Sequence, residues 1–239
     1  MARLIDINLK LSGSQIKKAM QSAIVKELNT IVNRVWYEIN SEARDIIEET
    51  IKETSEYGSL IEDSGHSLKA EFGIEDPDSK LQTIIDTWLS GVRIILKPIR
   101  FGGNRLLGGI QIQAIDSSYK DVINLPEAHH EVTRKRNNEK NDIRWLEWLL
   151  TEGTNPLIYY FYVDDEWDPT RYESRTGLAV MKYLESAVWR VPDWVQPAVY
   201  GDNWITRAMQ EAAQKVRAFI AASIGLQTPG NIGLRNVRR

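Results

Sequence analysis

The chain contains neither glycine nor proline between Gly13 and Gly58. Within that stretch apolar residues recur at steps of three or four, at Ile16, Met20, Ile24, Leu28, Ile31, Val35 and Ile39. This spacing predicts one face of an α-helix, close to a heptad seam. An unbroken helix over residues 14–54 would be about 60 Å long, whereas a compact domain of 239 residues is only ~45 Å in diameter. The helix must therefore break or project beyond its own domain.

Two arrangements satisfy this constraint. In the first, the helix breaks at the polar pair Asn40 and Ser41 and forms two packed core helices. In the second, it stays whole and packs on another subunit over part of its length, since exposed apolar stripes of that size usually mark an interface. Ile24 and Ile31 lie near the middle of the stripe, and we expect them to contact an adjacent subunit or a neighbouring protein.

In the rest of the chain, segments whose apolar residues recur at helical spacing alternate with segments whose apolar residues recur at every second position. Helices are expected at residues 80–89, 143–150 and 204–224, and a turn-rich segment with short apolar anchors at residues 55–80. Strands are expected at residues 92–99, 110–114, 157–163 and 177–181, with a hairpin turn at Gly102-Gly103-Asn104 between the first two. Residues 126–142 carry balanced positive and negative charges and are expected to form a loop or a frayed helix.

This order of elements predicts an α+β fold, in which a small antiparallel sheet packs with the long N-terminal helix and the C-terminal helix. We expect a single α+β domain over residues 1–225. Trp204, the first residue of the last helix, should be largely buried beside a cap at Asp202 or Asn203. Residues 226–239 form a basic C-terminal tail with Arg235, Arg238, Arg239 and no acid. We expect this tail to become ordered mainly on contact with neighbouring proteins.

Composition excludes several functional classes. The chain has no cysteine, which excludes a disulfide framework, thiolate metal sites and a cysteine nucleophile. Its net charge of −3 argues against a dedicated nucleic-acid binder. No apolar stretch approaches the ~20 residues of a membrane span, so no membrane contact is expected.

The sequence shows no catalytic constellation. The densest acidic cluster is Asp164, Asp165, Glu166 and Asp168, whose oxygens would suit a hard cation. Its spacing does not match an EF-hand loop, and we interpret it as a solvated turn after a strand. His129 and His130 are adjacent, so they should point in different directions. We therefore expect no enzymatic activity, no cofactor and no metal, and keep a metal-dependent hydrolase using Asp164, Asp165 and Asp168 as the alternative.

Several blocks of the sequence resemble the neck proteins of long-tailed bacteriophages. They begin with residues 54–60 (TSEYGSL) and 68–74 (LKAEFGI) and continue with residues 145–150 (WLEWLL) and 174–181 (SRTGLAVM). The combination of Trp189-Arg190-Val191-Pro192 with residues 201–208 (GDNWITRA) carries most of the resemblance. Together the blocks are similar to tail-completion and head-to-tail joining proteins.

The resemblance implies a structural virion protein of the phage neck, located in the virion. Copies would form a homo-oligomeric ring, with a hexamer as the expected state, in contact with other neck, portal-side and tail-tube proteins. DNA would pass through the lumen without specific binding, since a channel wall that is not basic does not bind the DNA phosphates electrostatically. Trp189 and Trp204, together with the three tail arginines, are then expected at interfaces. A tail or baseplate adaptor with the same sheet-and-helix module is the second interpretation.

Overall fold

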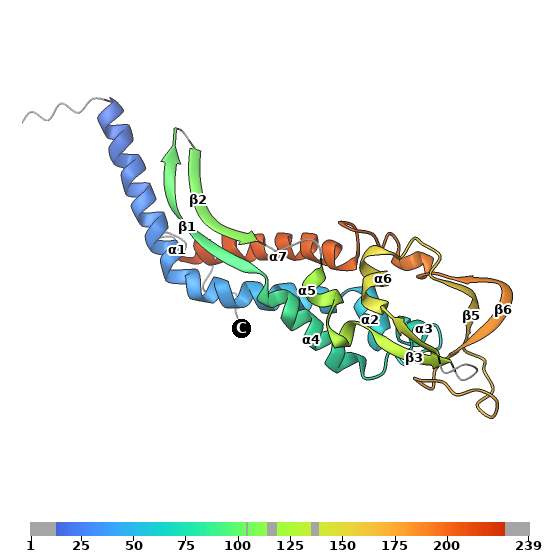
Figure 1. The fold of residues 1–239 in the computed structure, drawn as a ribbon. Coiled ribbons are helices and arrows are strands. Elements are labelled where there is room, and N and C mark those ends of the chain that lie inside the picture. The colour runs from blue at the N-terminus through green and yellow to red at the C-terminus, as the bar shows by residue number, and fades with distance from the viewer. Residues whose placement is uncertain (1–12, 104, 114–118, 135–138, 228–239) are drawn as a thin grey trace, which may run out of the picture. The chain divides into compact units, whose positions relative to one another are not determined.

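The computed structural model of the chain describes residues 13–103, 105–113, 119–134 and 139–227. Its helices are α1 (Gly13–Lys52), α2 (Ser55–Ile61), α3 (Leu68–Phe72), α4 (Pro77–Ser90), α5 (Lys120–Ile123), α6 (Trp145–Thr151) and α7 (Trp204–Gln227), with two short 3-10 turns, η1 (Pro126–Ala128) and η2 (Asp193–Val195). Its strands are β1 (Arg93–Gly102), β2 (Arg105–Gln113), β3 (His130–Arg134), β4 (Glu139–Ile143), β5 (Ile158–Asp164) and β6 (Val180–Trp189). The α+β class with a long N-terminal helix and a C-terminal helix is confirmed (Figure 1).

The strands form three separate antiparallel ribbons of two strands each, β1–β2, β3–β4 and β5–β6, in the part of the chain that is described. The expectation of one small sheet was wrong in this detail. The chain divides into two compact units: unit 1 comprises Met1–Asn40, Ile94–Ile112 and Ile220–Arg239, and unit 2 comprises Ser41–Arg93 and Gln113–Phe219.

Helix α1 is continuous from Gly13 to Lys52, so the expected break at Asn40 and Ser41 is absent. Two polar residues do not interrupt backbone hydrogen bonding, and the stretch holds no proline or interior glycine that would. The boundary between the two units nevertheless falls between these residues. Beyond it, within unit 2, the buried face of α1 continues through Ala43, Ile47 and Ile51, which are at most 1% exposed.

Unit 2 contains two short helices where the sequence indicated only turns. The Thr54 hydroxyl accepts from the Tyr57 amide (3.2 Å) and caps α2, and the Ser67 hydroxyl accepts from the Ala70 amide (3.2 Å) and caps α3. Gly73 ends α3 in the left-handed conformation (φ 65°), which glycine adopts without steric cost. Of the apolar anchors expected in this segment, Leu60, Leu68 and Phe72 are buried in the core, whereas Ile61 is only partly buried.

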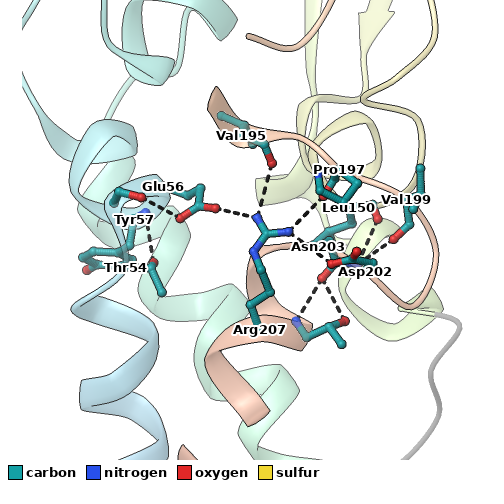
Figure 2. A network of polar contacts seen from close by, with 12 residues as sticks. Thr54, Glu56, Tyr57, Leu150, Val195, Pro197, Val199, Asp202, Asn203 and Arg207 are labelled. Atoms are coloured by element: carbon teal, nitrogen blue, oxygen red, sulfur yellow. Dashed lines mark hydrogen bonds and ion pairs between the residues drawn. The ribbon is translucent and has the colours of Figure 1, made fainter. Parts of the chain in front are cut away.

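The start of α7 is fixed by a polar network in unit 2 (Figure 2). Asn203, which is fully buried, accepts from the Thr206 amide (3.0 Å) and so caps the helix. Its Nδ2 donates to the carbonyl oxygens of Leu150 (2.9 Å) and Val199 (3.3 Å). One turn later Arg207 pairs with the buried Glu56 carboxylate of α2 (2.7 Å). The network therefore joins α2, α6 and the loop before α7 through hydrogen bonds rather than apolar packing alone.

Several helix and strand boundaries, and the structure of one charged segment, differ from the expectation. Helix α7 continues past Gly225 to Gln227, because a single glycine costs only about 1 kcal/mol in a helix. Residues 126–142, expected as a loop or frayed helix, contain η1 and most of the ribbon β3–β4. Glu131 lies opposite Asp142 in the register and pairs with Lys140 (2.7 Å). The alternating charges of this segment thus include a cross-strand ion pair.

Candidate functional site

The apolar stripe of α1 is buried only over its second half. In unit 1 Ile31, Val35 and Ile39 are at most 2% exposed, whereas Ile16 and Ile24 are 45% and 43% exposed. Met20, between them, is 60% exposed. The three exposed side chains follow one another at steps of four, so they lie on the same face of the helix. This face is the part of the stripe that remains available to a partner.

The same unit carries exposed apolar side chains on β2, where Leu106 and Leu107 are 48% and 46% exposed. Strand β1 is attached to α1 by the side-chain amide of Asn29. Its Nδ2 donates to the Ile99 carbonyl (2.9 Å), and its Oδ1 accepts from the Ile99 amide (2.8 Å). The amide thus gives the backbone of β1 the two hydrogen bonds that a neighbouring strand would supply.

The other residues expected at interfaces are covered by their own chain or lie outside the described residues. Ile31 is 1% exposed, Trp189 6% and Trp204 1%, and the expected burial of Trp204 is confirmed. Arg235, Arg238 and Arg239 fall in residues 228–239, outside the described part of the chain. Ile24 is therefore the expected interface residue that the described structure leaves at the surface.

Trp189 nevertheless lines two hollows of unit 2. Its ring packs edge-on against Phe72 (centroids 5.4 Å apart) and lies 6.0 Å from the ring of Trp148. Its Nε1 donates to the Glu71 carboxylate (2.6 Å) from α3. Burial raises the pKa of Glu71, and the hydrogen bond from Trp189 opposes that rise. The pair thus places a half-buried acid at the wall between the two hollows.

The larger hollow has a volume of about 550 Å³, which falls within the range of ligand pockets, roughly 300–1,000 Å³. Its walls come from α3, the β3–β4 ribbon, residues 171–175 and the ends of β5 and β6. Most of its lining is apolar or aromatic, including Phe72, Val132, Trp148, Met181 and Trp189. A cavity of this kind with a few polar groups is the usual form of a binding site.

His130 also lines this hollow and is 8% exposed. Burial and the nearby cations Arg175 and Lys80 lower its pKa to about 4, against the opposing effect of Glu75 and Asp142. The imidazole is therefore neutral near pH 7. Its Nδ1 is buried and has no hydrogen-bond partner among the described residues. The adjacent His129 instead contacts Asp142 through Nδ1 (2.8 Å), so the two histidines do have different surroundings.

The acidic cluster does not converge on one point. Each of its three aspartates has its own partner: Asp164 pairs with Lys182, Asp165 with His66 (3.0 Å), and Asp168 with the amide and hydroxyl of Thr170 (2.9 and 2.7 Å). In the described ranges no group of three acidic or histidine side chains could hold a metal ion. The geometry thus offers no support for the hydrolase alternative.

The β5–β6 ribbon carries an aromatic surface that was not expected from the sequence. Tyr159, Tyr160 and Tyr183 are 56%, 52% and 67% exposed, and the Tyr160 ring lies within 6.5 Å of the other two. Tyr160 has a φ of 69° at an irregularity in the register, a strained conformation for a residue with a side chain. The sequence signal for this surface is that tyrosine occurs on both faces of residues 158–164 (IYYFYVD). A strand with only one buried face needs apolar or aromatic residues only at alternate positions.

No family model, curated protein or solved structure matches this chain. Among the described residues, no helix is both long enough and apolar enough to cross a membrane.

Proposed function

We propose that this protein is a structural component of the phage neck, in which copies assemble head to tail into a ring around the DNA channel. The observation that carries the proposal is the exposed half of the α1 stripe, with Ile16, Met20 and Ile24 on one face. Contiguous apolar side chains at a surface usually mark an interface. A head-to-tail contact that closes by rotation gives a cyclic ring, and a hexamer is the state that the sequence resemblance implies.

The resemblance supplies the rest of the proposal. It implies contacts with other neck, portal-side and tail-tube proteins, and passage of DNA without specific binding. The net charge of −3 agrees with a channel that does not bind phosphates tightly.

The contact is tested by placing charges on the exposed face of α1. The variant Met20→Glu with Ile24→Glu should assemble poorly while remaining folded, because both side chains are already exposed in the single chain. Ile31 is unsuitable for this test, since a charge at a buried position would unfold the chain itself. The matched control is Ser22→Glu with Thr30→Glu, which adds the same charge at exposed positions outside the stripe.

The measurement is light scattering after gel filtration, combined with negative-stain electron microscopy of the same samples. The unaltered chain and the control should give rings, and the Met20/Ile24 variant should give a monomer with an unchanged circular dichroism spectrum. An unaltered chain that stays monomeric at high concentration would contradict the ring. Antibody labelling of virions then locates the protein: label at the head–tail junction supports the neck, and label at the distal tail end supports a baseplate adaptor.

A further inference from the structure

The hollow beside Trp189 contains a carboxylate, that of Glu71, with no lysine or arginine partner among the described residues. Its lining contains three carboxylates and two guanidinium groups, namely Glu71, Glu131, Glu173, Arg171 and Arg175. Both guanidinium groups have carboxylate partners outside the lining, since Arg171 pairs with Asp168 (3.4 Å) and Arg175 with Glu75 (3.1 Å). Neither arginine is therefore paired with Glu71.

Glu71 is the acid that remains without a cation. Its carboxylate accepts a hydrogen bond from Trp189 Nε1 (2.6 Å) and forms no ion pair with any described lysine or arginine. Glu131, by contrast, pairs with Lys140 (2.7 Å). A half-buried carboxylate gains strongly from a guanidinium or ammonium group, because charge-assisted hydrogen bonds are roughly twice as strong as neutral ones. The hollow thus favours a ligand with a cationic group.

His130 adds a second polar group to the same wall. It is more than nine-tenths buried, and its Nδ1 has no hydrogen-bond partner in the described ranges. A buried polar atom normally has a hydrogen-bond partner, either a protein group or an ordered water, so this position can accept a donor. Apart from the charged residues already named and Ser174, the walls are apolar and aromatic. A fitting ligand therefore combines nitrogen donors with an apolar body, as an arginine next to aliphatic side chains does.

We propose that this hollow binds an arginine-bearing apolar chain segment, and that the segment is residues 228–239 of a second copy of the protein. This segment reads TPGNIGLRNVRR, so it has three arginines, no acid, and Ile232, Leu234 and Val237 beside them. Its charge complements the unpaired Glu71, and its aliphatic side chains match the apolar walls. Fully extended, it would reach roughly 40 Å. The choice of a second copy rests on the proposed ring.

The test is photo-crosslinking in the full chain. Tyr172 lines the hollow and is 44% exposed, so p-benzoylphenylalanine replaces an aromatic side chain there at little structural cost. Equal amounts of ¹⁴N- and ¹⁵N-labelled chains are mixed, irradiated and analysed by mass spectrometry. We expect crosslinks from position 172 to residues 228–239 in pairs that combine one light and one heavy copy.

Two variants test the chemistry of the contact. Glu71→Gln keeps an acceptor for Trp189 but removes the charge, and the triple change of Arg235, Arg238 and Arg239 to alanine lies outside the described core. Each should lower the crosslinked fraction roughly ten-fold, whereas Glu185→Gln, at an exposed position on β6 outside the hollow, should leave it unchanged. Near-ultraviolet circular dichroism checks that the Glu71→Gln variant is folded.

Several results would overturn the inference: no crosslink to residues 228–239, crosslinks confined to a single copy, or equal crosslinking after the arginine changes. The ring is measured separately by light scattering. Rings without this crosslink would refute the inference and leave the proposed function standing, and a monomer would refute the proposed function.

Discussion

Replacing Asn203 with aspartate should destabilise unit 2 in a pH-dependent way. The side chain is fully buried and uses both ends of its amide. Oδ1 accepts from the Thr206 amide (3.0 Å), while Nδ2 donates to the carbonyl oxygens of Leu150 (2.9 Å) and Val199 (3.3 Å) (Figure 2). Aspartate retains the acceptor that caps α7 but replaces the donor with an oxygen that faces two carbonyl groups.

The magnitude follows from the lost donor and the buried charge. A buried carbonyl left without a donor costs about 1–3 kcal/mol, and burial of the ionised carboxylate adds to this. We expect Asn203→Asp to lower the free energy of unfolding by about 3 kcal/mol or more at pH 7. Burial raises the pKa of the new carboxyl in the folded state above its unfolded value near ~3.9. The protonated carboxyl can donate a hydrogen bond to the Leu150 carbonyl. The loss of unfolding free energy should therefore shrink as the pH falls through the pKa of this carboxyl in the folded state.

Urea unfolding followed by tryptophan fluorescence measures this effect, since every tryptophan except Trp36 lies in unit 2. The matched control is Asn124→Asp. Asn124 Nδ2 also donates to a carbonyl, that of Lys120 (2.8 Å), but at an exposed position where water can replace the bond, so the loss should stay near ~0.5 kcal/mol. If Asn203→Asp costs no more than the control at pH 7, or if its deficit is unchanged at pH 4.5, the reasoning fails.

Three further outcomes follow from the same structure. Trp204→Ala should lower the free energy of unfolding by about 3–5 kcal/mol, because the side chain is 1% exposed; a melting temperature within a degree or two of the unaltered protein would contradict the packing. Folding lowers the pKa of His130 from its ordinary 6.5 to about 4. The neutral imidazole therefore makes its full contribution to the free energy of unfolding above pH 6.5, and this contribution is lost as the pH falls to 4. In urea unfolding, His130→Gln should remove about 3 kcal/mol of the change in unfolding free energy between these pH values. Asn29→Ala should accelerate hydrogen exchange of the Ile99 amide, its direct partner (2.8 Å), and leave the tryptophan-monitored unfolding of unit 2 unchanged; continued protection of that amide would show that β1 is held in another way.

Periodicity predicted the elements whose signal is local. The steps of three and four in α1 and α7 identified both helices, and the polar residues before Trp204 correctly placed the start of α7. The ends were less predictable. Gly225 and the pair Asn40 and Ser41 resemble interruptions, but each costs too little to stop a helix that tertiary packing supports.

The β3–β4 ribbon could not be inferred in the same way. Its charged residues resemble a solvated segment when they are considered singly. Their pairing depends on register, which places Glu131 opposite Asp142 and close to Lys140. Such cross-strand contacts depend on the register of the two strands, and no local pattern reports them.

The hollow was also beyond local inference, because its polar groups come from distant segments. Glu71 and Trp189 are 118 positions apart in the sequence, and His130 comes from a third element. The sequence resemblance singled out Trp189, but neither residue type nor spacing connected it with the other two. Only the fold brings an unpaired acid, an unpartnered imidazole and an indole to one wall.

If residues 228–239 of one copy occupy the hollow of the next, the contact has a direction, and two defective chains should complement each other. A chain cut after Gln227 and carrying the crosslinker at position 172 has an intact hollow but no segment to donate. A Glu71→Gln chain has the segment but a weakened hollow. Neither should crosslink alone, whereas their mixture should give a crosslink from the hollow of the cut chain to the segment of the Glu71→Gln chain. Moving the crosslinker to the Glu71→Gln chain should lower the product roughly ten-fold, because the hollow beside the crosslinker then lacks the charge of Glu71. Equal crosslinking in both arrangements would show that Glu71 does not hold the segment.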